Sequence, residues 1–299
     1  MSFSVEVKSE LLKQYSKSRH CQLAELAAII SMEGHIDENG QLYIYSDNMA
    51  VLEKYTMLLK HLFHVDVTQA LSKEQTYQIL EAVKLQECAS IAAVLESEYS
   101  LQGKRVNGLI VQNTCCKRAF LRGAFLAAGS VSDPWKSYHW EIVCHSKEQA
   151  KQLQELMEPF ELEAKMVVRN HRYVVYLKEG SQIVDSLNVM EAYVSLMKLE
   201  NIRIEKEMRN SINRQVNCET ANINKTVTAA VRQIQDIELI RDHGGLEQLS
   251  ESLYEMAILR LEHPDTPLKD LGGLLDPPVG KSGVNHRLRK LSEIAEQYR

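Results

Sequence analysis

The sequence predicts an α+β protein in which a two-fold pseudo-symmetric α/β domain is followed by an all-α domain. Three observations lead to this fold class. A nine-residue helical segment, residues 26–34, has a counterpart at residues 121–129. The same order of helices and strands is predicted around each copy, and the last quarter of the chain has only helical periodicity. Because a repeat at a fixed offset is typical of a duplicated structural unit, two related halves are expected.

The two copies share small residues but differ at one acidic position. The first reads Leu-Ala-Ala-Ile-Ile-Ser-Met-Glu-Gly and the second reads Leu-Arg-Gly-Ala-Phe-Leu-Ala-Ala-Gly, at an offset of 95 residues. The offset maps Gly34 onto Gly129, but it maps Glu33 onto Ala128. Small side chains let two helices approach closely, since side-chain size sets the distance between their axes. We therefore expect the two segments to pack against each other.

Both segments resemble the LAGLIDADG motif of homing endonucleases. In that family two such helices pack together, and each ends in an Asp or Glu that binds the metal ion for DNA cleavage. Glu33 occupies the first acidic position, whereas the methyl group of Ala128 cannot bind Mg²⁺, which requires oxygen ligands. Because the second acid is absent, we expect Glu33 to be a vestigial acid, with no catalytic residue and no metal site, although vestigial metal binding at Glu33 stays open. Asp37 and Asp133 lie a few residues beyond the motifs and leave open a nuclease with a displaced second acid.

The first repeat, about residues 15–100, is expected to combine helices of regular apolar spacing with strands of β-rich composition. A further short helix precedes it. The predicted helices are residues 4–14, 21–34 and 48–63, and the predicted strands are residues 41–46, 65–70 and 77–83. The two last strands are expected to pair.

The second repeat, about residues 110–197, shows a similar order of elements. The predicted helices are residues 116–129, 148–160 and 181–197, and the predicted strands are residues 138–145, 165–169 and 172–177. Asn170-His171 separates the last two strands, which is typical of a two-residue hairpin turn. Together the two repeats predict a LAGLIDADG-like domain over residues 1–197.

Residues 198–225 are predicted to be a basic, asparagine-rich connector between domains. Asparagine is a poor helix former that favours caps and turns. Apolar residues recur here at near-helical spacing, so we expect part of the connector to be helical. Residues 201–232 contain six Lys or Arg and three Asp or Glu. We therefore expect Arg209, Arg214 and Lys225 to contact DNA.

Residues 226–299 are predicted to form a helix-turn-helix domain. Residues 226–263 indicate two helices with a break near residues 243–245, followed by a short helix at 268–275. A last helix begins near Ser282, a candidate N-cap. Its apolar residues recur with a spacing that defines one buried face. They are Val284, Leu288, Leu291 and Ala295.

The last helix has a basic outer face, as in a helix-turn-helix whose second helix enters the major groove of DNA. Asn285, His286 and Arg289 are expected to meet base edges, because Asn can read adenine and Arg can read guanine. The whole set of predicted DNA-binding residues is Lys281, Ser282, Asn285, His286, Arg287, Arg289 and Lys290. Of these, Lys281, Arg287 and Lys290 are expected to bind phosphates.

Composition limits the other classes of function. The net charge is −5, and residues 1–190 contain 20 Lys or Arg against 23 Asp or Glu, so the repeat domain does not attract DNA through its charge. No apolar run reaches the length of a membrane span, and the N-terminus has no secretory signal. The six cysteines show no CxxC spacing, which indicates scattered, reduced thiols and no metal cluster. We expect no cofactor and no small-molecule substrate.

With all segments in view, the chain resembles the WhiA family of bacterial sporulation and cell-division regulators. The resemblance lies in the Ser-Phe-Ser start, the Arg-Ala-Phe-Leu-Arg-Gly-Ala-Phe-Leu-Ala-Ala-Gly block at residues 118–129, residues 213–225, and residues 281–291. It implies a cytoplasmic, nucleoid-associated regulator that binds double-stranded DNA and acts in transcription, sporulation, cell division or chromosome segregation, without nuclease chemistry. Two alternatives remain: the metal-dependent endonuclease, and a scaffold whose repeat domain binds a protein partner, with secondary DNA contact.

Overall fold

A computed structural model describes residues 2–65, 70–86 and 90–299 of the chain. Its contacts divide the protein into two compact units, Met1–Lys206 (unit 1) and Glu207–Arg299 (unit 2), each with its own apolar core. The boundary falls within one continuous helix, α9 (Tyr193–Asp242), which contributes residues to both units. Within the described ranges, no helix combines the length and the apolar character needed to cross a membrane.

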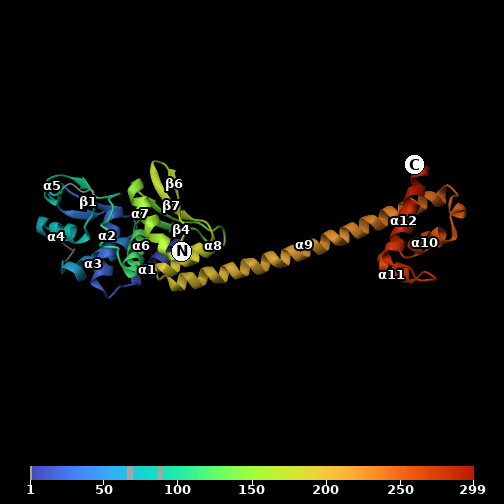
Figure 1. Ribbon diagram of the computed structural model, residues 1–299, viewed down its shortest axis with the longest axis horizontal. Coiled ribbons are helices and arrows are strands. Elements are labelled where there is room, and N and C mark those ends of the chain that lie inside the picture. Colours follow the sequence, from blue (N-terminus) through green and yellow to red (C-terminus); the bar gives the residue numbers. More distant parts are fainter. Residues whose placement is uncertain (1, 66–69, 87–89) are drawn as a thin grey trace. The chain divides into compact units, whose positions relative to one another are not determined.

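The first repeat of unit 1 combines a small antiparallel sheet with several helices (Figure 1). Its helices are α1 (Phe3–Lys13), α2 (Arg19–Glu33), α3 (Met49–Phe63), α4 (Lys73–Val83) and α5 (Ile91–Val94). Its strands are β1 (Gly34–Ile36), β2 (Leu42–Ile44) and β3 (Tyr99–Ser100), in the order β2-β1-β3. Helix α2, which carries the first motif, is buried along most of its length.

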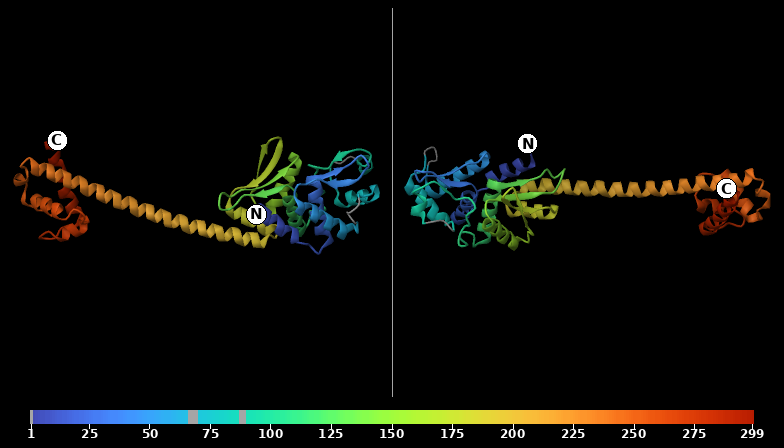
Figure 2. Two further views of the ribbon diagram at one scale, coloured as in Figure 1. Left: turned by 180° about the vertical axis from the view of Figure 1, so that it is seen from behind. Right: turned by 90° about the horizontal axis from the view of Figure 1, so that it is seen from above.

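The second repeat has a larger antiparallel sheet, in the order β4-β5-β7-β6. Its strands are β4 (Gly129–Val131), β5 (Trp140–Cys144), β6 (Lys165–Arg169) and β7 (Arg172–Leu177), and its helices are α6 (Thr114–Ala128), α7 (Lys147–Met157) and α8 (Gly180–Val189). Asn170 and His171 both have positive φ, as a two-residue hairpin requires, which confirms the predicted β6–β7 hairpin. Figures 1 and 2 show this hairpin projecting from unit 1.

The predicted duplication is confirmed at the motif helices. Helices α2 and α6 begin 95 residues apart, and each leads directly into a strand at a glycine. A side chain at Gly34 would place its Cβ 2.4 Å from the carbonyl oxygen of Ile30, and one at Gly129 would collide with Phe125 at 2.3 Å. Both glycines are therefore required by close packing at the helix-to-strand transition.

Helices α2 and α6 lie side by side, as the small residues predict (Figure 1). A Cβ at Gly123 would be 2.5 Å from the carbonyl oxygen of Glu25 and 3.1 Å from the Cβ of Ala28. The backbones of the two motif helices are therefore in contact, and any larger residue at Gly123 would separate them.

The strand predicted at residues 77–83 is wrong, because this segment lies in α4. The side chain of Ser72 accepts a hydrogen bond from the amide of Gln75, whose own side chain accepts one from Ser72, and this capping box starts the helix. Ile79, Leu80 and Val83 then face the core at helical spacing. The strand predicted at residues 65–70 falls largely outside the described residues.

The closing helix predicted at residues 181–197 is also wrong as a single element. Helix α8 ends at Val189 and α9 begins at Tyr193. Between them Glu191 adopts a left-handed backbone conformation, with φ of 67°, which a helix cannot contain. The chain therefore turns before α9.

The connector expected over residues 198–225 is helical throughout, as part of α9. Each asparagine costs at most about 0.7 kcal/mol relative to alanine in a helix, and helix growth from both ends adds one hydrogen bond per residue. Isolated asparagines therefore do not interrupt it. Every side chain from Glu207 to Ala229 is exposed.

Unit 2 packs three further helices around the C-terminal part of α9 (Figure 2). These are α10 (Glu251–Glu262), α11 (Leu268–Gly273) and α12 (Lys281–Ala295). The predicted apolar face of α12 is confirmed, since Val284, Leu288, Leu291 and Ala295 are all buried. They meet Ile237 and Ile240 of α9 and the buried residues of α10 and α11 in one core.

Candidate nucleic-acid interface

The connection between α11 and α12, residues 274–280, packs closely against one glycine in each of the two helices. A Cβ at Gly272 would lie 2.0 Å from the carbonyl oxygen of Val279, and one at Gly283 would lie 2.3 Å from the Val279 side chain. The amide of Val279 also donates a 2.9 Å hydrogen bond to the carbonyl of Gly272. The connection is therefore held tightly against both helices, as a helix-turn-helix requires.

The outer face of α12 presents the polar residues that the helical phase predicts. Asn285, His286, Arg289 and Lys290 are all exposed. Arg287 lies on the flank, half-buried, and its guanidinium donates a 3.5 Å hydrogen bond to a backbone carbonyl at the start of α10. The exposed side chains are thus available to a ligand, whereas Arg287 is partly engaged within unit 2.

The N-cap predicted at Ser282 is wrong. Helix α12 begins at Lys281, and Gly280 is its N-cap, without a side-chain cap. Ser282 is therefore an exposed residue of the first helical turn, and its hydroxyl remains on the outer face.

The outer face of α12 also carries an acidic residue, Glu293. It lies one turn after Arg289, and its carboxylate is 3.4 Å from the Arg289 Nε. Both side chains are well over half exposed, and exposed pairs of this kind contribute about 0–1 kcal/mol. The pair can therefore open when a better partner for Arg289 approaches.

A basic cavity of about 400 Å³ lies beside the N-terminus of α12. Four of its lining residues are cations and none is acidic. The cations are Lys225 of α9, Arg260 of α10, Lys269 of α11 and Lys281 of α12. Because four helices bring these charges together, the cavity suits an anion such as a phosphate.

Arg260 has the most specific environment in this cavity. Its side chain is only 2% exposed, and Nη1 donates a 2.8 Å hydrogen bond to the carbonyl of Thr266. Its Nε is buried and has no hydrogen-bond partner among the described residues. Burial lowers the pKa of Arg260, and the nearby Asp265 opposes that shift. Neither Arg260 nor Lys269 was predicted, because their positions in the sequence give no sign that they approach Lys281.

Helix α9 also borders the exposed polar face of α12. Arg232 of α9 lines a shallow groove of about 300 Å³ together with Asn285 and Arg289. Of the predicted connector contacts, Lys225 lies in the basic cavity, whereas Arg209 and Arg214 lie on the exposed part of α9. Cations of α9 and α12 therefore share one groove with Asn285.

The attraction for phosphate is local to this face. Unit 2 contains 12 Lys or Arg and 14 Asp or Glu, a net charge of −2. The charge of the whole unit therefore does not favour an anionic ligand, and the cations gathered around α12 are the local exception.

In unit 1, Glu33 at the end of α2 is half-buried and lies near a cation. Burial raises the pKa of Glu33 to about 7; Lys8 of α1 opposes this shift and Asp47 adds to it. Burial likewise lowers the pKa of Lys8 to about 8, and Glu33 opposes that change. The vestigial acid thus has an ammonium group as its neighbour, with Ala128 at the position of the second acid.

The two displaced acids stabilise loops. Asp37 accepts hydrogen bonds of 2.9 and 2.8 Å from the amides of Asn39 and Gln41, and Asp133 accepts one of 3.0 Å from the amide of Trp135. In the part of the chain that the structure describes, no group of three or more potential metal ligands includes Glu33, Asp37 or Asp133.

The one such group identified among the described residues lies at the other end of the motif helices. It consists of His20, Cys21, Cys115 and Cys116. The expectation of scattered cysteines is therefore wrong for three of the six, because packing of α2 on α6 brings them together.

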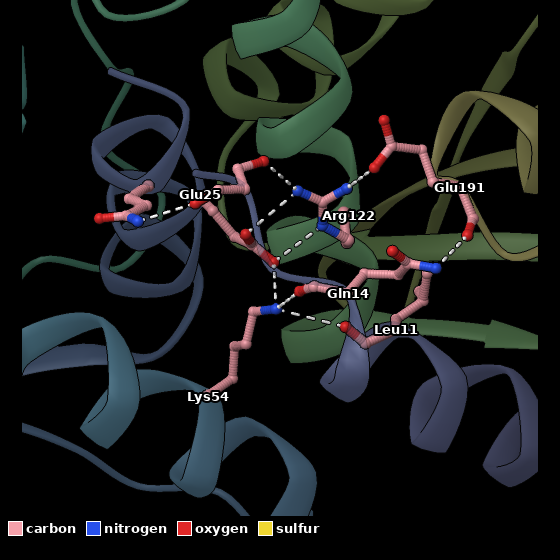
Figure 3. Close-up of polar contacts among 8 residues, drawn as sticks. Leu11, Gln14, Glu25, Lys54, Arg122 and Glu191 are labelled. Carbon is pink, nitrogen blue, oxygen red and sulfur yellow. Dashed lines mark hydrogen bonds and ion pairs between the residues drawn. The ribbon is translucent and has the colours of Figure 1, made fainter. Parts of the chain in front are cut away.

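A buried ion network joins the two repeats at the middle of the helix pair (Figure 3). Arg122 of α6 donates from Nε to the Glu25 carboxylate of α2 at 3.0 Å and from Nη1 to Glu191 at 2.7 Å. Lys54 of α3 lies 3.2 Å from the same Glu25 carboxylate and donates to the carbonyls of Leu11 and Gln14 at the end of α1.

The positive and negative charges of the network balance, and the network occurs once rather than in each repeat. It contains two cations and two anions, and the side chains of Glu25, Lys54 and Arg122 are at most 1% exposed. Burial lowers the pKa of Lys54, and the Glu25 carboxylate opposes that shift. The 95-residue offset maps Glu25 onto Phe120 and Arg122 onto Ala27, so the network is not duplicated. Its geometry supports a structural role in joining unlike halves.

Comparisons with known proteins agree with this architecture. Two family models match the chain: the WhiA LAGLIDADG-like domain over residues 117–209, and the WhiA C-terminal HTH domain over residues 212–295. A probable cell division protein WhiA from Lachnoclostridium phytofermentans is 53% identical over the full length of both chains. One from Lachnospira eligens is 48% identical and covers all of this chain and 98% of its own.

A solved structure shows the same fold. The crystal structure of full-length DUF199/WhiA from Thermatoga maritima is 24% identical in sequence and superposes with a TM-score of 0.57. The match covers 100% of this chain and 99% of the other. A LAGLIDADG-like region followed by a helical helix-turn-helix region is thus the architecture of both proteins.

Proposed function

The chain belongs to the WhiA family, and we propose that it is a sequence-specific DNA-binding regulator of transcription that does not cleave DNA. The observation that carries this proposal is the exposed polar face of α12 beside a cavity with four cations and no acid. Since relatives are named probable cell division proteins, we propose that the regulated genes serve cell division, sporulation or chromosome segregation. The protein would then work at the nucleoid.

The proposed division of roles follows the position of each side chain. Asn285, His286 and Arg289 read base edges in the major groove, because they are exposed near the middle of α12. Phosphates are bound by cations at the borders of that face, which release counterions from the DNA. These exposed cations are Lys225, Lys269, Lys281 and Lys290.

The same proposal excludes nuclease chemistry on three grounds. Ala128 offers no ligand at the second acidic position, and the ammonium group of Lys8 is close to the first acid, Glu33. Asp37 and Asp133 already accept hydrogen bonds from the backbone of their own loops. These features support a repeat domain that retained the fold and lost the metal site.

The proposal is tested with duplexes selected from a random library by the full-length protein. Losing a bidentate base contact costs about 1–3 kcal/mol and relaxes specificity at one position, whereas losing a phosphate contact weakens all sequences alike. Arg289→Ala should therefore reduce the ratio of specific to random affinity about 5- to 150-fold. Lys290→Ala should lower both affinities and leave their ratio nearly unchanged.

Two results would contradict these assignments. Failure of the wild-type protein to enrich any sequence would exclude sequence-specific binding. Equal changes in the affinity ratio for Arg289→Ala and Lys290→Ala across a salt titration would show that the roles along α12 are divided differently.

A further inference from the structure

The N-terminal ends of the two motif helices meet at four potential metal ligands. His20 and Cys21 belong to the first turn of α2, and Cys115 and Cys116 belong to the first turn of α6. The repeat offset of 95 residues maps His20 onto Cys115 and Cys21 onto Cys116, so equivalent positions of both repeats form the cluster. The four ligand atoms all lie within 4.8 Å of one another.

The distances fit tetrahedral coordination. The Nδ1 atom of His20 is 3.1 Å from the sulfur of Cys116, 3.3 Å from that of Cys21 and 4.0 Å from that of Cys115. Zinc binds thiolates at about 2.3 Å and imidazole at about 2.0–2.1 Å, so two ligands on one tetrahedral centre are roughly 3.5–3.8 Å apart. The observed separations lie on both sides of this range, so small side-chain adjustments would let one cation bind all four atoms.

The ligand types select a soft, tetrahedral cation. Three thiols and one imidazole form a Cys₃His set, which is typical of closed structural zinc sites, whereas Mg²⁺ and Ca²⁺ require oxygen ligands. A disulfide would use two sulfurs and leave the third thiol and the imidazole without a role. Hence the convergence of all four groups favours a metal over an oxidised pair.

The surroundings favour thiolates once a cation is present. The cluster lies at two helix N-termini, where the helix dipoles stabilise negative charge. Cys21 and Cys116 are buried, whereas His20 and Cys115 are exposed, so a cation can enter from the solvent side.

We propose that His20, Cys21, Cys115 and Cys116 form a structural zinc site that joins the N-terminal ends of α2 and α6. The site lies at the opposite end of these helices from Glu33 and Ala128 and is independent of any vestigial nuclease metal. Four protein ligands leave no open position for a substrate. The role is to hold the two repeats together, beyond the contacts of the Glu25–Arg122 network.

The test uses the full-length protein, reduced and stripped of metal, with Zn²⁺ and Co²⁺ as probes and Mg²⁺ as a control. We expect one Zn²⁺ per chain by native mass spectrometry and, with Co²⁺, the visible absorption of a tetrahedral thiolate site. Zn²⁺ should raise the thermal unfolding midpoint of unit 1 by about 5–10 °C at a free concentration ~100 times its dissociation constant. Mg²⁺ should do neither.

The variants separate ligation from folding. Cys115→Ser and His20→Ala change exposed side chains. Loss of a residue that only supports a metal ligand typically weakens metal binding ~10- to 100-fold, so loss of a direct ligand should weaken zinc binding by at least that much. Cys218→Ser changes an exposed cysteine of α9 outside the cluster and should leave zinc binding unchanged. Circular dichroism without metal should be the same for all three variants.

Three results would overturn the proposal. The first is that the reduced wild-type protein takes up no zinc. The second is that Cys115→Ser binds zinc as tightly as the wild type. The third is a disulfide between two of the three cluster cysteines in protein isolated under reducing conditions.

Discussion

Glu25 and Arg122 are the residues on which the packing of the two repeats most depends. Each is buried, and each has its charge compensated only by the other members of the network. A buried pair contributes little net stability over an apolar replacement, but loss of one partner leaves an uncompensated charge. The network was not predicted, because neither residue departs from helical periodicity and their contact depends on how α2 and α6 pack.

Arg122→Leu should lower the free energy of unfolding of unit 1 by about 3–5 kcal/mol, since the Glu25 carboxylate would remain buried with only Lys54 as its cation. Denaturant unfolding followed by tryptophan fluorescence measures this, because Trp135 and Trp140 both lie in unit 1. As a control, Arg105→Leu removes a more exposed pair with Glu155 and should cost about 1 kcal/mol or less. Equal losses for the two variants would refute the assigned role of the network.

Glu33 should make the stability of unit 1 depend on pH. Its pKa is about 7 in the folded protein against an ordinary value of 4.5, so its stabilising contribution is present below about 4.5 and is lost as pH rises through 7. Glu33→Gln does not titrate, and should gain stability relative to the wild type between about pH 5 and pH 8. Since solvent screens this half-buried group, the gain should be on the order of 1 kcal/mol. A difference that does not vary with pH, in matched urea titrations, would count against the environment described for Glu33.

Helices and turns were predicted correctly where the residues that determine them lie close together in the sequence. Asn48 caps α3, the motif helices begin 95 residues apart, and Asn170-His171 forms the hairpin turn. Strands β1 and β3 were not predicted, because three and two residues are too few to show alternation.

Other elements were not predicted, either because they depend on contacts between distant residues or because a helix-capping sequence was overlooked. The break between α8 and α9 occurs where Glu191 turns to meet Arg122, which no local pattern indicates. The helix at residues 73–83 could have been predicted from its Ser-x-x-Gln capping box. In the candidate interface, the exposed face of α12 followed from helical phase, whereas Arg260 and Lys281 line one cavity only because of tertiary packing.

The last two residues of α11, Gly272 and Gly273, give a matched pair of glycine variants beside the connection to α12. Gly272→Ala places a methyl group 2.0 Å from the Val279 carbonyl and should destabilise unit 2 by about 1–3 kcal/mol or more. Gly273→Ala meets no atom within 4 Å and should be neutral, or stabilising by about 0.5–1 kcal/mol. Thermal unfolding and DNA affinity check both variants. Equal tolerance of the two changes would show that the connection is looser than described.

At the scale of the whole molecule, the distribution of charge restricts how DNA can bind. Unit 1 contributes −3 and unit 2 contributes −2 to the net charge of −5, so neither unit attracts DNA through its overall charge. Binding through about four phosphate contacts predicts a slope of log affinity against log salt near −3.6. A much steeper slope would require cations outside the α12 face.

The intact protein should not nick DNA. A supercoiled plasmid incubated with the protein and Mg²⁺ or Mn²⁺ should remain supercoiled, because Ala128 removes one ligand position and Lys8 neighbours the other acid. Glu33→Gln should leave DNA affinity unchanged. Metal-dependent nicking that disappears in Glu33→Gln would restore the nuclease hypothesis.

The central claim is that DNA is bound by the α12 face of unit 2 and not by the repeat domain. The most direct measurement compares two charge-reversed full-length proteins on the same selected duplex by fluorescence anisotropy at physiological salt. Lys281→Glu/Lys290→Glu alters the α12 face, whereas Lys60→Glu/Lys151→Glu alters exposed lysines of α3 and α7 in unit 1. We expect the first protein to lose at least about 100-fold in affinity and the second to change less than about threefold. Strong loss in the second protein with little loss in the first would contradict the claim and assign DNA binding to the repeat domain.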